Sequence, residues 1–204
     1  MSKRLLLIGA LNLGAFTTLA AAQMDHGSHS MPGMSAPATI TPGGMAHSMD
    51  MGALSQLSGK AFDRAFLSMM IAHHQGAIDM SKVVVNNTKD PQVRRWTADI
   101  LRVQQQEIGQ MNAWLKSLGG LDRARRDGMA REMNAMLATL KKNRDSDRAL
   151  VEGMLPHHAS AIDMATLALQ RSSDARVLGL ARNIIRTQAD EMYAYRQWLL
   201  SRRS

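Results

Sequence analysis

Two pairs of adjacent histidines, each flanked by methionines, are the residues of this sequence best suited to chemistry. The first set is Met70, His73, His74 and Met80, and the second, 84 residues further on, is Met154, His157, His158 and Met164. On a helix that turns about 100° per residue, each set falls within an arc of roughly 120°. Thioether sulfur and neutral imidazole are soft ligands for metal ions. A lone histidine on an apolar face is usually a hydrogen-bonded core residue, but a flanked pair that occurs twice favours a metal site.

An acidic residue interrupts the apolar face of the segment that follows each histidine pair. Glu107 shares its face with Met111, and Glu191 shares the equivalent face with Tyr195. A buried carboxylate needs a cation or strong hydrogen-bond donors. Two compatible explanations stay open: a Glu–His link that only ties two helices together, or a carboxylate that orients an imidazole of a metal site. The second site is the weaker candidate because Tyr195 replaces a thioether.

A third group of soft ligands lies in residues 23–58, which are rich in Gly, Ser, Pro and Ala and have no hydrophobic period. This composition predicts a flexible tail. A flexible chain does not need methionine for packing, so these residues are candidates to wrap a Cu(I) or Ag(I) ion. They are Met24, His26, His29, Met31, Met34, Met45, His47, Met49 and Met51.

The first 22 residues have the pattern of a signal peptide. Lys3 and Arg4 precede an apolar run from Leu5 to Leu19, and three alanines follow at positions 20–22. We expect cleavage near Gln23 and a mature protein in the periplasm or secreted. The alternative is an uncleaved membrane anchor, but the run is short for a span of about 20 residues.

The overall composition excludes several classes of site. The 204 residues include 17 Met and 7 His but no Cys, so disulfide scaffolds, thiolate zinc sites, iron–sulfur clusters and cysteine nucleophiles are ruled out. The net charge is +8. The basic residues are spread along the chain without interleaved aromatic residues, which favours a solvated surface over a nucleic-acid partner.

The elements that must position these residues are helices. An apolar helical period and its breakers predict helices at residues 59–87, 91–118, 121–142, 147–171 and 174–202. Asp90-Pro91 marks the start of the second predicted helix, and Gly119-Gly120 marks its end. The third predicted helix has a stripe of apolar residues that we expect to be buried: Met129, Met133, Met136 and Leu140. The sequence therefore predicts an all-α fold at residues 59–204. Its repeated halves, 59–118 and 143–202, are two helical hairpins of one four-helix bundle, with an extra connecting helix.

Residues 59–200 resemble the DUF305 family (domain of unknown function 305). The resemblance rests on MMIAHHQGAIDM and MLPHHASAIDM, each followed by a Q-x-x-E helix that ends in Trp-Leu. It implies a ferritin-like four-helix bundle in an exported protein, with some relatives associated with copper binding and copper resistance. The implied metal positions are Met70, His73, His74, Met80, Glu107 and Met111 in the first half, and Met154, His157, His158, Met164 and Glu191 in the second. The second half has Pro156 in place of Ala72, which removes a backbone donor and predicts a kink.

The ferritin-like resemblance raises the hypothesis of a di-iron oxidase, which requires Glu-x-x-His motifs. No Glu in this chain is followed three residues later by His. A His-Glu-x-x-His motif, a nucleophile elbow and a phosphate-binding loop are absent as well. We therefore expect a protein that is not an enzyme.

The function that the sequence favours is an exported copper-binding protein that sequesters or buffers Cu(I) and contributes to copper tolerance. Cu(I) is the favoured ion, with Ag(I) and Cu(II) as alternatives. The second hypothesis is a non-catalytic structural or interaction protein of the cell envelope, in which the His–Glu pairs only stabilise the bundle. A homo-oligomer and a copper-delivery partner are left open.

Overall fold

The computed structural model describes residues 51–202, and these residues are helical with no strand among them. The helices are α2 (Gly59–Val84), α3 (Pro91–Leu115), α4 (Arg123–Lys141), α5 (Ser146–Arg171) and α6 (Ala175–Leu200), with the 3₁₀ turn η1 (Lys116–Leu118) after α3. The predicted all-α class and the order of the helices are confirmed. The predicted signal peptide and all tail candidates except Met51 lie outside the described residues.

The folded part begins before the predicted end of the tail at residue 58. Residues 51–55 are helical, Leu54 is fully buried, and Met51 packs against the same apolar cluster as Leu54. Met51 therefore contributes to the core of the bundle.

Aspartate caps begin four of the helices, as their sequence favours. The Asp90 carboxylate accepts hydrogen bonds from the backbone N–H groups of Gln92 and Val93, with Pro91 at the first helical position. Asp122, Asp145 and Asp174 cap α4, α5 and α6 in the same way. Gly119 and Gly120 have φ of 91° and 80°, a backbone conformation that favours glycine, and they end the second helical segment where the sequence predicts.

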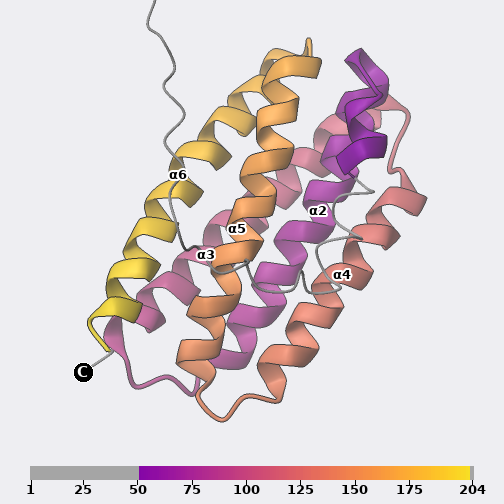
Figure 1. The fold of residues 1–204 in the computed structure, drawn as a ribbon. Helices are drawn as coiled ribbons and strands as arrows, with labels where there is room; N and C mark the ends of the chain where they lie inside the picture. The colour runs from indigo at the N-terminus through magenta and orange to yellow at the C-terminus, as the bar shows by residue number, and fades with distance from the viewer. Residues whose placement is uncertain (1–50, 203–204) are drawn as a thin grey trace, which may run out of the picture. The chain divides into compact units, whose positions relative to one another are not determined.

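The two hairpins, α2–α3 and α5–α6, meet where α2 packs against α5 (Figure 1). Equivalent hydrogen bonds join the loop of one hairpin to the first turn of the other. The Thr88 hydroxyl donates to Asp147 at 2.7 Å, and Ser172 is hydrogen-bonded to the equivalent residue Asp63. Because each bond has its equivalent in the other half, the two hairpins are related by an approximate twofold axis. The pKa of Asp63 is raised, chiefly because its carboxyl is buried.

The connecting helix α4 has no counterpart in the second half and runs alongside α2 (Figure 1). Met129 and Met133 are buried between the two helices and Met136 is partly buried, which confirms the predicted apolar stripe. Gly76 makes the close approach possible, because a Cβ there would lie 2.6 Å from the Cβ of Met133. On the other central helix, α5 continues through Pro156 without ending.

Replacing Gly76 by Ala should destabilise the bundle. The new methyl group overlaps the root of the Met133 side chain, so α4 has to shift, at a cost of about 1–3 kcal/mol. Gly109→Ala is the matched control, since this exposed position in α3 has nothing within 4 Å of a built Cβ. The control should gain about 0.5–1 kcal/mol from helix propensity. Urea unfolding measures both, and an unchanged stability of Gly76→Ala would contradict the proposed tight contact.

Candidate metal centre

The four bundle histidines lie where the central helices α2 and α5 pack together. His73 and His157 face each other, with ring centroids 3.8 Å apart. The Nε2–H of His157 donates to the His73 carbonyl at 3.1 Å, and the Nε2–H of His73 donates to the His157 carbonyl at 3.0 Å. The pair therefore sits on the approximate twofold axis and joins the two hairpins at their centre.

The other two histidines reach outward to the flanking helices. Nε2 of His74 lies 2.7 Å from the Glu107 carboxylate of α3, and Nε2 of His158 lies 2.7 Å from Glu191 of α6. The interhelical Glu–His link expected from the sequence is thus present in both halves. The two links differ in direction: the first is a well-formed hydrogen bond, whereas the Glu191 oxygen is at ion-pair distance but lies off the hydrogen-bonding direction of the His158 nitrogen.

The hydrogen-bond acceptors determine which ring nitrogen carries the proton. Carbonyl and carboxylate oxygens only accept, so His73, His74 and His157 each carry hydrogen on Nε2. In the neutral form of such a ring the opposite nitrogen, Nδ1, holds a lone pair, and in all four histidines Nδ1 is buried without a hydrogen-bond partner. An imidazole whose N–H is held by an oxygen while its other nitrogen is bare has the arrangement typical of a metal ligand.

Burial keeps the central pair in the neutral form that binds metals. Desolvation lowers the pKa of His73 and His157 well below the usual value of 6.5, and the neighbouring imidazoles lower it further. A proton on either ring would be held in an apolar interior, which is costly. Both rings are therefore neutral at physiological pH.

Ser160 is a residue of this centre that the sequence analysis missed. Its hydroxyl donates to the His157 carbonyl at 2.9 Å and lies 2.7 Å from Nε2 of His73. The one N–H at this nitrogen is shared between the Ser160 hydroxyl and the His157 carbonyl. The equivalent residue in the first half is Gly76, which instead makes room for α4. The replacement of Gly76 by Ser160 between the two repeated motifs was the available signal.

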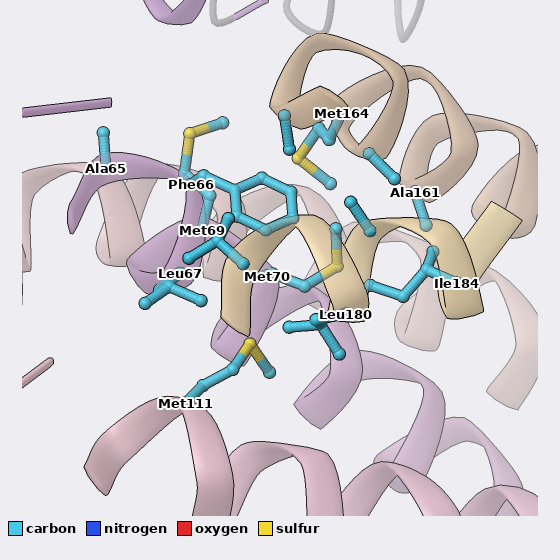
Figure 2. Packing of buried hydrophobic residues seen from close by; sticks show 14 of the residues in the cluster. Ala65, Phe66, Leu67, Met69, Met70, Met111, Ala161, Met164, Leu180 and Ile184 are labelled. Atoms are coloured by element: carbon cyan, nitrogen blue, oxygen red, sulfur yellow. The ribbon is translucent and has the colours of Figure 1, made fainter. Parts of the chain in front are cut away.

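The structure groups the methionines differently from the prediction. Met70 and Met111 belong to the same buried cluster as Met164, which comes from the second half. Figure 2 shows these three thioether side chains in the core they share with Leu180 and Ile184. We call the three methionines Met70, Met111 and Met164 the Met70 cluster. The Met154 cluster contains Met80, Met154 and Tyr195.

This exchange between the halves follows from helix geometry. Met70 and Met80 lie ten residues apart on one helix, which is about 15 Å along its axis. Two thioethers at that separation cannot bind one ion, so the predicted grouping of Met70 with Met80 around one first site is replaced by two mixed groups. Each group takes one methionine from α2 and one from α5.

Tyr195 lies against the second histidine pair, with its ring centroid 5.4 Å from that of His158. Its hydroxyl is buried without a hydrogen-bond partner, and burial together with nearby Glu191 raises its pKa far above the usual value of 10.0. The phenol therefore stays neutral and contributes no thioether. The two halves thus offer different ligand sets.

Within residues 51–202, no group of three or more His, Asp or Glu side chains is placed to hold a metal ion. The same residues contain no helix that is long and apolar enough to span a membrane.

Comparison with known proteins places these features in a family. The sequence pattern of the domain of unknown function DUF305 matches residues 13–115 and 77–199. The chain belongs to the DUF305 family. The two overlapping matches span both hairpins of the bundle, and its ferritin-like fold is that of solved DUF305 structures.

Solved structures similar to this DUF305 chain include CopM in a Cu(I)-bound form, with 26% identity over 70% of this chain and 98% of CopM, at a TM-score of 0.59. CopM in a Cu(II)-bound form is 25% identical over 68% of this chain and 96% of CopM, at a TM-score of 0.57. A DUF305 protein from Streptomyces coelicolor is 26% identical over 69% of this chain and 93% of its own chain, at a TM-score of 0.61.

A curated relative is the uncharacterized protein L153 of Acanthamoeba polyphaga mimivirus, 49% identical over 53 residues. The match covers 26% of this DUF305 chain and 35% of the viral protein, so the chain spans about a third of that relative.

Lowering the pH should destabilise the metal-free protein. The unfolded chain protonates His73 and His157 near pH 6.5, whereas the folded protein holds their pKa well below that value. Below pH 6.5 the unfolded state therefore binds more protons, and each histidine removes up to about 1.4 kcal/mol of unfolding free energy per pH unit. Urea unfolding at about pH 7 and about pH 5.5 measures the loss.

The matched control is the double variant His73→Gln with His157→Gln. A glutamine amide can still donate a hydrogen bond to the facing carbonyl but does not titrate. The double variant should lose most of the stability change in this pH range. An equally steep pH dependence in this variant would show that other groups cause it.

Proposed function

We propose that this DUF305 protein is an exported copper-binding protein that sequesters or buffers Cu(I) and contributes to copper tolerance. Two kinds of similarity support the proposal. The CopM structures, which have the same fold, were obtained in Cu(I)-, Cu(II)- and Ag-bound forms. The Streptomyces coelicolor relative is described as a secreted protein, which agrees with the signal-peptide pattern of residues 1–22.

The observation that carries the proposal is the set of bare Nδ1 atoms in the bundle core. A buried acceptor without a partner costs about 1–3 kcal/mol, and the Nε2 hydrogen bonds make Nδ1 such an acceptor in neutral His73, His74 and His157. Nδ1 of His158 is buried without a partner at the equivalent place. Cu(I) is a soft ion that accepts few ligands and tolerates irregular geometry. Binding such an ion would satisfy the lone pairs with no rearrangement of the Nε2 hydrogen bonds.

The first candidate site combines His74 with the thioethers of the Met70 cluster. Met70 lies one helical turn before His74 on the same face of α2, and Met111 lies one turn after Glu107 on α3. The Glu107 carboxylate accepts the Nε2–H of His74, which orients the ring and makes its free nitrogen a better donor. Met164 supplies a third thioether from α5.

The second candidate site is built from His158, Met154 and Met80, with Tyr195 in place of the third thioether. Since it has one soft ligand fewer and a less well-directed Glu–His contact, we expect it to bind Cu(I) more weakly. In this proposal the tail of residues 23–50 captures the ion and the bundle stores it away from water.

The structural hypothesis also has an observation in its favour. The His73–His157 bonds and the His74–Glu107 bond join helices without any metal. A protein of the cell envelope that used these contacts only for stability would have the same hydrogen bonds. Metal titration separates the two functions.

The mature protein should compete with a chromogenic chelator for Cu(I) under anaerobic conditions. A version without residues 23–50 should bind fewer ions but keep the bundle sites. The truncation ends at residue 50 because Leu54 is buried in the core. Adding His73→Ala and His74→Ala to that version should remove the stronger bundle site. No competition with a micromolar chelator would refute copper binding, and an unchanged stoichiometry in the double variant would refute the first bundle site.

Met70→Leu should weaken Cu(I) binding by about tenfold, because it removes one thioether from the first site. Leucine fills nearly the same volume, so the cost in stability should stay below about 1.5 kcal/mol. Met129→Leu is the matched control, since Met129 is equally buried in the same apolar core but lies outside the repeated motifs and is not one of the three proposed thioether ligands. Equal affinities of the two variants in the chelator titration would exclude Met70 as a ligand.

A further inference from the structure

The buried histidines leave a cation few routes from solvent. The relative exposure of His73, His74, His157 and His158 is 0–1%. Glu107 and Glu191 touch the outer two imidazoles and have side-chain exposures of 21% and 25%. These carboxylates therefore connect solvent to the candidate ligands, and both come from helices on the same side of the bundle.

A seam between α3 and α6 leads to both carboxylates. Each of these helices packs closely against its hairpin partner, but the two make few contacts with each other. A cavity of about 40 Å³ lies between them and is lined by Glu107 and Glu191 together. An outer groove of about 340 Å³ is also lined by Glu107, so this residue borders both spaces. The inner cavity is large enough for water, since one molecule needs about 10–15 Å³.

The inner cavity contains a second polar pair that the proposed copper sites do not use. Gln104 and Gln188 line it and are equivalent in the repeat, with relative exposures of only 5% and 4%. The side-chain carbonyl oxygen of each is buried without a hydrogen-bond partner. A buried oxygen without a partner lowers stability. Because the same unpaired oxygen occurs at equivalent positions in both halves, it indicates that these oxygens contact a ligand.

The charge of the cavity favours a cation. Its lining includes the carboxylates of Glu107 and Glu191, and that of Asp99, which is paired with Arg102 at 2.9 Å, and contains neither Lys nor Arg. Amide and carboxylate oxygens can replace part of the water around an entering ion. They bind copper more weakly than imidazole and thioether do, so an ion would pass on to the core.

We propose that the α3–α6 seam is the entrance for copper, with the oxygens of Gln104, Gln188, Glu107 and Glu191 as a transit site. The ion exchanges water for these oxygens and then moves to Nδ1 of His74 or His158. This inference rests on the proposed function and adds the route by which the bundle sites are filled. It predicts that the two glutamines control the rate of loading and leave the final occupancy unchanged.

The test follows the loading of Ag(I), a redox-inert probe of the Cu(I) sites, by imidazole ¹⁵N NMR of the full mature protein. The nitrogen signals of His74 and His158 report arrival in the core. Gln104→Leu with Gln188→Leu should slow their change by about tenfold, equivalent to about 1.4 kcal/mol in the barrier. Gln105→Leu is the control, because this exposed residue of α3 does not line either space.

A second pair of variants avoids any change in the core. Thr187 is exposed and lines the cavity, so Thr187→Lys places a positive charge at the entrance while Thr187→Gln adds similar bulk without charge. Loading should be slower with lysine than with glutamine, and this difference should shrink in high salt.

The outcomes separate the two proposals. Equal loading rates in the wild type and all variants would overturn the entrance, while leaving the copper sites in place. Unchanged histidine signals in the wild type at saturating Ag(I) would overturn the bundle sites and the entrance together. A lower final occupancy in the glutamine variant would contradict a transit role and make the glutamines part of the storage site.

Discussion

The reciprocal hydrogen bonds between His73 and His157 are the interaction on which the rest of this bundle depends. They fix α2 against α5 at the centre of the molecule and occupy both Nε2 atoms with backbone carbonyls. Because each ring has only two nitrogens, this leaves Nδ1 as a bare acceptor in the core. The same contact brings the second histidine of each pair toward the flanking helix, where a glutamate is placed to meet it.

The approximate twofold symmetry is broken at a few positions, and each break has a physical consequence. Gly76 admits Met133 of α4, whereas its counterpart Ser160 is hydrogen-bonded to the histidine pair. Met111 supplies a thioether where the other half has a neutral phenol at Tyr195. The two halves therefore place similar but unequal side chains around their histidine pairs.

Most of the fold could be predicted because its signals are local. Asp90-Pro91 and Gly119-Gly120 act through the conformations of neighbouring residues, and the observed helix boundaries follow them closely. Residues 51–55 were missed because their helix is fixed by the burial of Leu54, a contact with distant residues. Ser160 and the two buried glutamines were missed for the same reason. What such a polar residue does depends on its partners, or on their absence, and these are set by other parts of the chain.

The sequence by itself determined which residues are chemically competent: the repeated His pairs, their flanking methionines, and the glutamates on the partner helices. Periodicity is enough to place such residues on one face of a helix. Only the tertiary structure decided that Met70 belongs with Met164 and not with Met80. The grouping depends on how α2 and α5 pack. A projection down the helix axis puts Met70 and Met80 on the same face, but the rise of the helix places them about 15 Å apart along the axis. The tertiary structure also decided which imidazole nitrogen lacks a hydrogen-bond partner, because an acceptor on another helix determines which nitrogen carries the proton.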